Sequence, residues 1–297
     1  MSQTVIQIHY PYFRNNDYQL LDCGNFEKLE QFGPYIFRRP EPQAVWDKIY
    51  TEAAWEKADA IFTGDSPTEG KWNKRTPVKD RWEIRYQSDL LDFKMRLATT
   101  AFKHVGIFPE QCTNWEFIAE SVKKVKKPEP NVLNLFAYTG GATLAARQAG
   151  AFTTHVDSIK QVVTWANENA GLNSMDNIRW LVEDAVKFVQ REARRGNTYN
   201  GIILDPPAYG HGPKGEKWKL EDQILDLMKE VAKILNPEQH FLVLNTYSLG
   251  FSSLIVKNLL DQTMKKGTQN DIGEIVLKAK SGVLLPLGVV GRVSCNL

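Results

Sequence analysis

The second half of the chain alternates between apolar runs and amphipathic segments, and this rhythm constrains the fold more than any other feature. The apolar runs, which we expect to be strands, are residues 132–138, 153–157, 178–184, 201–207 and 240–248. The segments with helical spacing between them are residues 142–150, 162–171, 185–195 and 220–235. Strands that alternate with helices pair in parallel, with helices on both faces of the sheet. The lack of polar alternation in the strands is typical of a sheet buried on both faces.

The sequence therefore predicts an α/β fold with a doubly wound, mostly parallel sheet. A helix over 252–266 and an antiparallel edge hairpin of strands over 274–279 and 282–294 complete it. Residues 1–100 are instead rich in short, aromatic, strand-like pieces, with one amphipathic helix expected over 41–60. We thus expect a β-rich domain over 1–100, which could recruit a substrate, and an α/β domain over 101–297.

Composition narrows the class of protein. The chain has 297 residues, of which 42% are hydrophobic and 24% charged, as is typical of folded globular proteins. A net charge of +2 excludes an overall attraction to nucleic acid but allows a local basic patch. Cys23, Cys112 and Cys295 lie far apart without a CxxC pair, which predicts free thiols in a reducing, cytoplasmic compartment. We see no secretion signal and no apolar run of about 18 residues, so we expect no membrane partner.

In open α/β sheets, ligands bind outside the carboxyl ends of the strands. After the first strand, Gly140 and Gly141 allow a tight turn and a close approach of the backbone to a ligand. Neither GxGxxG nor GxxxxGK[ST] occurs, which disfavours a phosphate cradle. The glycine pair is equally compatible with a packing role alone.

Acidic residues follow the second and third strands. Asp157 can accept two hydrogen bonds from ribose hydroxyls, although Asp157 or Ser158 can also cap the next helix. Asp184, followed by Ala185, can accept a hydrogen bond from an exocyclic amine such as adenine N6. A helix cap is the alternative for Asp184 as well.

The fourth strand ends in Asp205-Pro206-Pro207-Ala208-Tyr209. The prolines lack an N–H group and hold the chain extended, so that the carbonyls before them are available as acceptors. Tyr209 offers a flat face on which a planar group can stack. This combination predicts a clamp for a planar, amine-bearing substrate. The alternative is a rigid turn with a packed tyrosine.

Taken in order, these strand ends resemble those of the class I S-adenosylmethionine-dependent methyltransferases, and within them the large-subunit ribosomal RNA methyltransferase I/K-like family. The segments that carry the resemblance are residues 106–115, 132–151, 154–170, 179–192 and 203–210. The resemblance implies a Rossmann-like sheet of seven mostly parallel strands, a transferase activity and S-adenosyl-L-methionine as cofactor. Gln111 is a weaker candidate, in a segment that in the family lies over the cofactor.

The resemblance also implies a role for each strand end. The residues implied in binding the cofactor are Phe136, Tyr138, Thr139, Gly140 and Gly141 for the methionine part, Asp157 and Ser158 for the ribose, Asp184 and Ala185 for the adenine, and Asp205. The residues implied in facing the methyl acceptor as catalytic residues are Asp205, Pro206, Pro207 and Tyr209.

The chain departs from this family in two respects. Members that methylate cytosine carbon 5 need a cysteine nucleophile, and neither residues 244–248 nor the Asp-Pro-Pro loop contains one. Direct transfer to a nitrogen, or to an oxygen, is the chemistry that remains, and it depends mainly on orientation of the acceptor. Asp205 can still take a proton or stabilise developing positive charge. The family's N-terminal RNA-binding domain of PUA type is also missing, and residues 1–100 stand in its place.

Basic residues mark three candidate RNA surfaces, and solvated helix faces are the alternative for each. They are Lys123, Lys124, Lys126 and Lys127; Arg191, Arg194 and Arg195; and Lys214, Lys217 and Lys219. The segment 211–219 follows the clamp directly and adds Trp218 for base stacking and His211, which is either a base or merely exposed. No spacing of His, Cys, Asp and Glu fits a metal site, so we predict no metal.

The leading hypothesis is a monomeric or homodimeric methyltransferase that binds RNA and modifies a base nitrogen, a guanine or adenine, in rRNA processing. A methyltransferase acting on nitrogen in a protein or small molecule is one alternative. A non-catalytic, S-adenosylmethionine-binding RNA assembly factor is another. An NAD-linked dehydrogenase is disfavoured because GxGxxG is missing.

Overall fold

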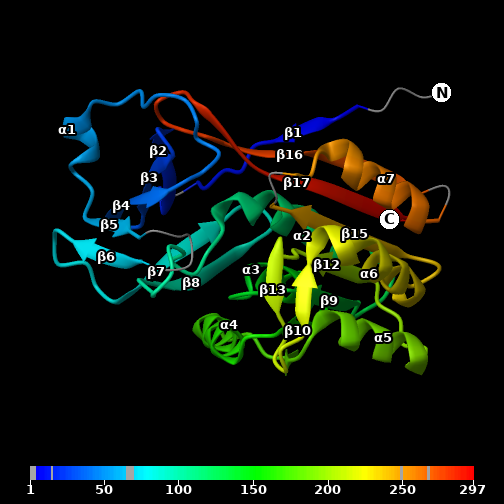
Figure 1. Ribbon diagram of the computed structural model, residues 1–297. Coiled ribbons are helices and arrows are strands. Elements are labelled where there is room, and N and C mark those ends of the chain that lie inside the picture. The colour runs from blue at the N-terminus through cyan, green and yellow to red at the C-terminus, as the bar shows by residue number, and fades with distance from the viewer. Residues whose placement is uncertain (1–4, 15, 65–69, 248–249, 266–267) are drawn as a thin grey trace. The chain divides into compact units, whose positions relative to one another are not determined.

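The computed structural model describes residues 5–14, 16–64, 70–247, 250–265 and 268–297 (Figure 1). The chain forms two compact units. The α/β unit comprises Thr113–Ile275 and Gly288–Leu297 together with His9 and the described residues before it, and the β unit comprises Tyr10–Cys112 and Val276–Leu287. The functional division of the chain at residue 100 stays a prediction.

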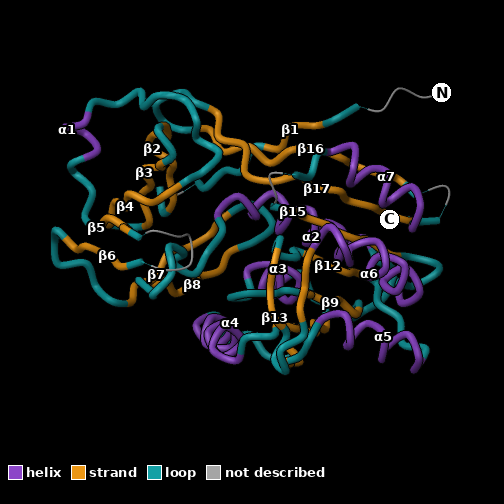
Figure 2. Tube along the Cα trace, viewed as in Figure 1, coloured by secondary structure: helices purple, strands orange, loops and turns teal. Residues whose placement is uncertain are grey.

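The α/β unit is built on one large sheet (Figures 1 and 2). Within the described residues it has eight strands in the order β1-β16-β17-β15-β12-β9-β10-β11. Their bounds are β1 Gln7–His9, β9 Asn131–Leu135, β10 Phe152–Asp157, β11 Ile178–Val182, β12 Gly201–Leu204, β15 His240–Thr246, β16 Gln269–Lys278 and β17 Leu284–Cys295. Most neighbours pair in parallel, and β17 runs antiparallel to β15. The predicted α/β, Rossmann-like fold class is confirmed, with β1 as an additional strand beside β16.

Helices cover both faces of this sheet, as the continuous apolar strands predict. The helices are α2 Cys112–Lys124, α3 Gly141–Gln148, α4 Lys160–Leu172, α5 Ala185–Arg195, α6 Leu220–Ile234 and α7 Ser253–Thr263. Leu242 and Leu244 of β15 pack in one core with α5, α6 and α7, whereas Phe241 and Val243 pack in another with α2 and α3. Successive side chains of a strand point to opposite faces, so every residue of β15 is buried. In the described part of the chain, no helix has both the length and the apolar character needed to cross a membrane.

The β unit contains a five-stranded sheet in the order β2-β3-β4-β5-β6 and a separate two-stranded ribbon of β7 and β8. Its strands are β2 Tyr18–Gly24, β3 Glu27–Phe32, β4 Tyr35–Pro40, β5 Ala60–Thr63, β6 Lys71–Lys74, β7 Arg81–Gln87 and β8 Asp92–Ala98. Exposed and buried residues alternate along β7 from Arg81 to Tyr86. This agrees with the strand-like, aromatic texture of the sequence before residue 101.

The prediction of a helix over 41–60 is wrong. Within that stretch, all of which the structure describes, helix is limited to α1, Glu52–Trp55. The backbone N–H groups of Ile49 and Tyr50 donate to a carboxylate oxygen of Asp22 on β2, at 3.1 and 2.8 Å. These N–H groups are therefore unavailable for the carbonyls four residues earlier, which interrupts the hydrogen-bond pattern of a helix at residues 49 and 50.

Asp22 is buried, and its Oδ2 also accepts a hydrogen bond from Nε1 of Trp55 at 3.0 Å. Replacement of Asp22 by Leu leaves three donors without an acceptor, of which Nε1 of Trp55 is buried and the two N–H groups are partly buried, so we expect the free energy of unfolding to fall by about 3 kcal/mol. Asp22→Asn keeps one oxygen for these donors and should cost about 1–2 kcal/mol. Urea unfolding of both variants checks this, and equal losses in the two would contradict the role of the shared oxygen.

Candidate functional site

The loop after β9 is held in an unusual backbone conformation. Phe136 and Tyr138 have φ angles of 54° and 48°, and Gly140 has a φ of 91°. Side chains other than glycine rarely adopt this left-handed region, and such residues cluster at functional sites. The N–H of Tyr138 donates to Oδ2 of Asp157 at 2.9 Å, and Asn169 donates to the carbonyl of Thr139 at 2.9 Å. The neighbouring strand and helix thus keep the loop in this shape.

The two glycines of this loop have different physical reasons to be glycine. Gly140 needs the freedom of its positive φ, and a Cβ there would lie 3.2 Å from the Cβ of Ala166. A Cβ on Gly141 would lie 2.5 Å from the ring of Trp115 on α2. Gly141 therefore admits the indole ring between helices, and its role at the cofactor stays a prediction.

Asp157 ends β10 beside this loop. Its two carboxylate oxygens accept from the N–H groups of Tyr138 and Ile159, the latter at 3.0 Å. Burial raises the pKa of the Asp157 carboxyl, and the backbone hydrogen bonds oppose this effect. Ile159, rather than Asp157 or Ser158, occupies the N-cap position of α4, without a side-chain hydrogen bond. Because each carboxylate oxygen has a second lone pair, Asp157 can still accept bonds from a ligand.

Asp184 is the N-cap residue of α5, as the alternative interpretation predicted. Its Oδ1 accepts a hydrogen bond from the N–H of Lys187 at 2.9 Å. Ala185, the first residue of α5, is buried. The neighbouring Glu183 is engaged by a two-pronged pair with Arg191. A second role of Asp184 toward an adenine stays a prediction.

Residues 209–219 form a hairpin of two short strands, β13 Tyr209–His211 and β14 Lys217–Lys219. Trp218 is only 5% exposed, its Nε1 donates to the carbonyl of Pro207 at 2.6 Å, and its ring lies 5.2 Å from that of Phe136. The interpretation of Trp218 as a stacking platform for a base is therefore wrong, because the indole is packed inside. It anchors the hairpin to the loop after β9.

The far end of the hairpin is tied to two other strand ends. Ser158 donates to the carbonyl of His211 at 3.1 Å, and Lys187 forms an ion pair with Glu216 at 2.5 Å. A Cβ on Gly212 would lie 3.0 Å from Oδ2 of Asp184. The hairpin thus contacts both Ser158 and Asp184, the positions assigned to the ribose and the adenine.

Asp205 stands at the end of β12, partly exposed, and is bound by a residue that sequence reasoning missed. Asn245 on β15 donates from Nδ2 to Oδ1 of Asp205 at 2.8 Å. Burial raises the pKa of Asp205 to about 6, and the hydrogen bond from Asn245 opposes this rise. The sequence feature that could have indicated Asn245 is its place as the polar residue after the apolar run of β15, just as Asp205 follows the apolar run of β12.

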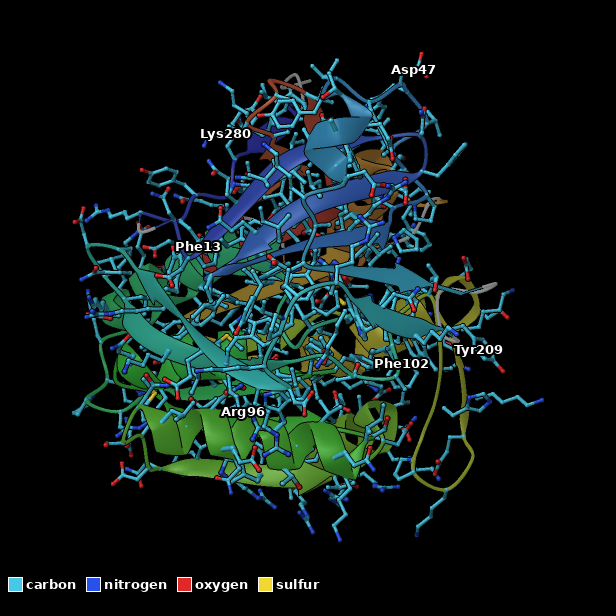
Figure 3. All side chains as sticks on the ribbon, turned by 90° about the vertical axis from the view of Figure 1, so that its left-hand side faces the viewer. Phe13, Asp47, Arg96, Phe102, Tyr209 and Lys280 are labelled. Carbon is cyan, nitrogen blue, oxygen red and sulfur yellow. The ribbon has the colours of Figure 1, made fainter. Side chains whose placement is uncertain are left out.

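The remainder of the clamp lies mostly at the surface. Pro206 is buried, whereas Pro207 and Ala208 are exposed and Tyr209 is 57% exposed (Figure 3). The hydroxyl of Tyr209 lies 3.2 Å from Nε2 of His211, with the two rings edge to face. The ring of Tyr209 is therefore exposed rather than packed inside, and its role in stacking on a planar group stays a prediction.

Parallel pairing accounts for how these residues meet. Leu135 pairs with Val156 and with Leu204, and Leu204 pairs with Leu244. The residues that follow these positions, Phe136, Asp157, Asp205 and Asn245, consequently lie at one edge of the sheet. Gln111 belongs to the β unit, in the 3₁₀ turn Pro109–Gln111, and its role stays a prediction.

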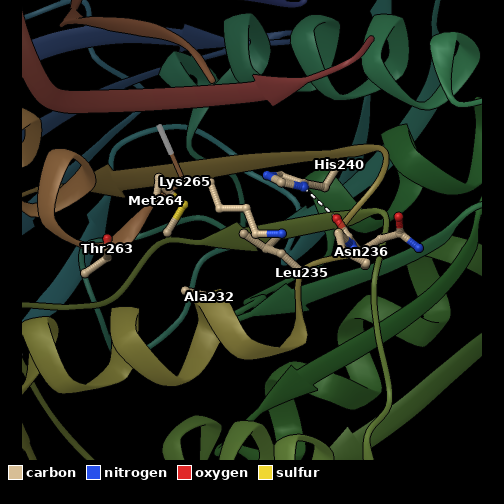
Figure 4. A pocket seen from close by; sticks show the side chains of 8 residues that line it. Ala232, Leu235, Asn236, His240, Thr263, Met264 and Lys265 are labelled. Atoms are coloured by element: carbon tan, nitrogen blue, oxygen red, sulfur yellow. Dashed lines mark hydrogen bonds between the residues drawn. The ribbon is translucent and has the colours of Figure 1, made fainter. Parts of the chain in front are cut away.

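A different pocket opens at the opposite end of β15 (Figure 4). It is lined by residues that end α6, begin β15 and end α7, namely Ala232, Leu235, Asn236, Pro237, His240, Thr263, Met264 and Lys265. Its open volume of about 20 Å³ suffices for one water molecule. Among the residues with described positions, no group of three or more His, Cys, Asp and Glu side chains could hold a metal ion. The absence of a metal in this protein stays a prediction.

Comparison with known proteins gives the following. No family model matches the chain. It is 26% identical over 156 residues to the ribosomal RNA large subunit methyltransferase K/L of Shewanella frigidimarina, covering 51% of this chain and 21% of that protein. It is 30% identical over 151 residues to the ribosomal RNA large subunit methyltransferase I of Tolumonas auensis, covering 50% of this chain and 38% of that protein. The chain thus spans well under half the length of these curated relatives.

A solved structure is more similar. The chain is 38% identical to an S-adenosylmethionine-dependent methyltransferase from Agrobacterium tumefaciens, with a TM-score of 0.91. The match covers 98% of this chain and 94% of that one, so the likeness extends over both units.

The raised pKa of Asp205 predicts a gain in stability on its removal. Its pKa moves from an ordinary 3.8 to about 6 in the folded protein, so ionisation above pH 6 costs folding about 3 kcal/mol at most. Because the carboxyl is partly exposed, we expect Asp205→Asn to raise the free energy of unfolding by about 2 kcal/mol at pH 8. The gain should vanish below about pH 4, where Asp205 is protonated in both states. Urea unfolding at the two pH values checks this, with the exposed carboxylate Asp226 as the control site; a gain independent of pH contradicts it.

The packing of Gly141 predicts a loss of stability with an informative control. Gly141→Ala places a methyl group inside the radius of the Trp115 ring, so we expect it to cost about 2–3 kcal/mol of unfolding free energy. Gly171→Ala, in a position of α4 with open space, should instead stabilise by roughly 0.5–1 kcal/mol. A Gly141→Ala protein that unfolds normally but loses cofactor affinity would show that this glycine serves the ligand rather than Trp115.

Proposed function

Because the chain belongs to the S-adenosylmethionine-dependent methyltransferases, we propose that it transfers a methyl group from this cofactor to a base nitrogen of RNA. The observation that carries the proposal is the strand end of Asp205, where a partly exposed aspartate precedes two prolines and an exposed tyrosine. A carboxylate that accepts an N–H and a ring that stacks are what a planar amine requires.

The residues at the sheet edge fit the cofactor. The strained loop at Phe136 and Tyr138 presents backbone groups that a regular turn would not, and Asp157 is a partly exposed acceptor beside it. The residues that would hold the cofactor are Phe136, Tyr138, Thr139, Gly140 and Gly141 for the methionine part, Asp157 and Ser158 for the ribose, and Asp184 and Ala185 for the adenine. When bound, S-adenosylmethionine supplies an electrophilic methyl group on a sulfonium centre.

Asp205 is the residue that acts on the acceptor. With a pKa of about 6, it is mostly ionised at neutral pH and accepts an N–H of the substrate amine. That hydrogen bond orients the nitrogen lone pair, which contributes to rate through alignment. As the C–N bond would form, the methyl–sulfur bond would break and its electron pair would stay on the sulfur, which leaves as a neutral thioether. The positive charge that develops on the nitrogen is stabilised by the carboxylate, or the carboxylate takes the proton. Tyr209 and Pro207 hold the plane of the base.

No described cysteine of the α/β unit lies near Asp205 that could attack a base and activate its carbon covalently. Cys23 and Cys112 are buried in the β unit, and burial raises the pKa of the Cys23 thiol to about 12. Cys295 pairs with His240 at the amino end of β15, away from Asn245 at its carboxyl end. None of the three cysteines, all of which have described positions, forms a disulfide, which agrees with the reducing cytoplasm that we propose as the site of action.

Two observations support RNA as the substrate. The curated relatives are named as ribosomal RNA methyltransferases. In addition, Lys214 and Lys217 are exposed on the hairpin that carries Tyr209, where they can contact phosphates while the ring stacks on a base. The set of Arg191, Arg194 and Arg195 is a weaker candidate, because Arg191 and Arg195 pair with carboxylates. A guanine or adenine of large-subunit ribosomal RNA is the target that we propose.

The test is transfer of labelled methyl groups from S-adenosylmethionine to RNA from a strain that lacks the protein. We expect label in one nucleoside of ribosomal RNA, identified by mass spectrometry. Asp205→Ala should lower the rate at least about 100-fold, since it removes the orienting carboxylate. Tyr209→Ala should lower it about 10-fold, whereas Tyr209→Phe, which retains the stacking ring, should stay within about threefold of the wild type.

Three results would overturn the proposal. Label confined to protein or to a small molecule indicates another acceptor. Binding of RNA and cofactor without single-turnover transfer indicates an assembly factor. Equal rates for Asp205→Ala and the wild type remove Asp205 from the mechanism.

A further inference from the structure

Asp205 and Asn245 meet because two neighbouring strands end together. β12 and β15 run parallel with Leu204 opposite Leu244, so the next residue of each strand lies beside the other. Nδ2 of Asn245 is 2.8 Å from Oδ1 of Asp205. Asn245 is 3% exposed, and so the bond lies on the protein side of the carboxyl.

Only one orientation of the Asn245 amide allows a hydrogen bond to Asp205. An ionised carboxylate accepts hydrogen bonds only, so the amide must turn its NH₂ group toward Asp205. On the other side, β17 runs antiparallel to β15, with Val290 opposite Asn245. A Cβ on Gly288 of β17 would lie 3.5 Å from Oδ1 and 3.7 Å from Nδ2 of Asn245, so the backbone there passes directly over the amide. The amide is consequently confined between two strands.

Resting on the function proposed above, we propose that Asn245 is a positioning residue of the methyl transfer. By holding Oδ1 of Asp205, it leaves Oδ2 to accept the N–H of the acceptor amine. Among the described residues, Oδ2 has no hydrogen-bond donor of its own. The Asn245 amide therefore decides which carboxylate oxygen meets the substrate, and in which direction.

The same hydrogen bond keeps the carboxyl ionised. Burial is the main influence on the pKa of Asp205 and raises it, and the Asn245 bond lowers it. From the elements around it, β15 and the β13–β14 hairpin included, no charged side chain with a described position contributes to this pKa. Glu216 and Lys219, the hairpin charges with shown partners, pair with Lys187 and Asp222. Loss of the amide thus shifts Asp205 toward its protonated, non-accepting form.

The experiment replaces Asn245 by Leu, which has a similar shape and no donor. We expect the pH midpoint of Asp205, followed by carbon NMR of labelled carboxyl groups in the full-length protein, to rise by about one unit above its wild-type value. The acidic limb of the rate of methyl transfer should rise with it, so that the loss of rate is roughly fivefold greater at pH 6 than at pH 9, where only the lost orientation of the carboxylate lowers the rate. Asn245→Ser, which is too short to reach Asp205, should shift both in the same direction.

Thr246→Val is the matched control. Thr246 is the next residue of β15 and is 1% exposed, and among the described residues its buried hydroxyl has no partner. This variant removes a buried polar group from the next position of the same strand, on the opposite face of the sheet, without touching Asp205, so both midpoints should stay where they are. A purely structural role for Asn245 predicts a loss of rate that is equal at every pH.

An unchanged NMR midpoint in Asn245→Leu, or an equal loss of rate across the pH range, would overturn the inference. Should the leucine variant not fold, the serine variant decides by the same two measurements. The NMR titration needs neither RNA nor cofactor. Failure of the wild type to methylate RNA therefore counts against the proposed function, while an unmoved midpoint counts against Asn245.

Discussion

The parallel pairing of β9, β10, β12 and β15 is the constraint on which the site depends. Parallel strands that share a register also share an edge, where their carboxyl ends lie next to one another. Phe136, Asp157, Asp205 and Asn245 come from segments up to 109 positions apart, yet pairing puts all four at the same level of the sheet. Backbone hydrogen bonds deep in the sheet, rather than loops, thus set the spacing between cofactor residues and acceptor residues.

The hairpin of β13 and β14 links the two halves of this edge. Its base is fixed by Trp218, which bonds to Pro207 and packs on Phe136. Its end is held by polar contacts with Ser158 and Lys187 that are open to water. Exposed polar contacts are individually weak, so these contacts stabilise the end of the hairpin less than Trp218 stabilises its base. The hairpin that carries Tyr209 is therefore fixed strongly beside Pro207 and weakly beside Ser158 and Lys187.

The site is costly to the fold, and the costs have a common origin. Phe136 and Tyr138 are held in left-handed backbone conformations, and Asp205 is ionised where burial disfavours charge. Each of these unfavourable features is stabilised by a neighbouring side chain. Asp157 accepts a hydrogen bond from the backbone of Tyr138, and Asn245 donates one to the carboxylate of Asp205. Proteins keep such features where activity requires them, at the expense of stability. The stabilities expected for Asp205→Asn and for wild type differ for this reason.

The sequence by itself determined the α/β class, the two-sided burial of the sheet, and the strand ends at which polar residues stand, since these follow from local periodicity and composition. It also indicated Asp157, Asp184 and Asp205 as the acidic residues of that edge, with alternatives that it left open. The tertiary structure decided between the alternatives that the sequence left open. Asp184 caps α5, Gly141 leaves room for the ring of Trp115, and Trp218 is buried. Asp22 binds the backbone of residues 49 and 50, which are therefore not helical. The tertiary structure alone brought Asn245 to Asp205. The physical reason is that each of these outcomes is a contact with a residue distant in the chain, and a local pattern records a side chain's preference but not the partner that satisfies it.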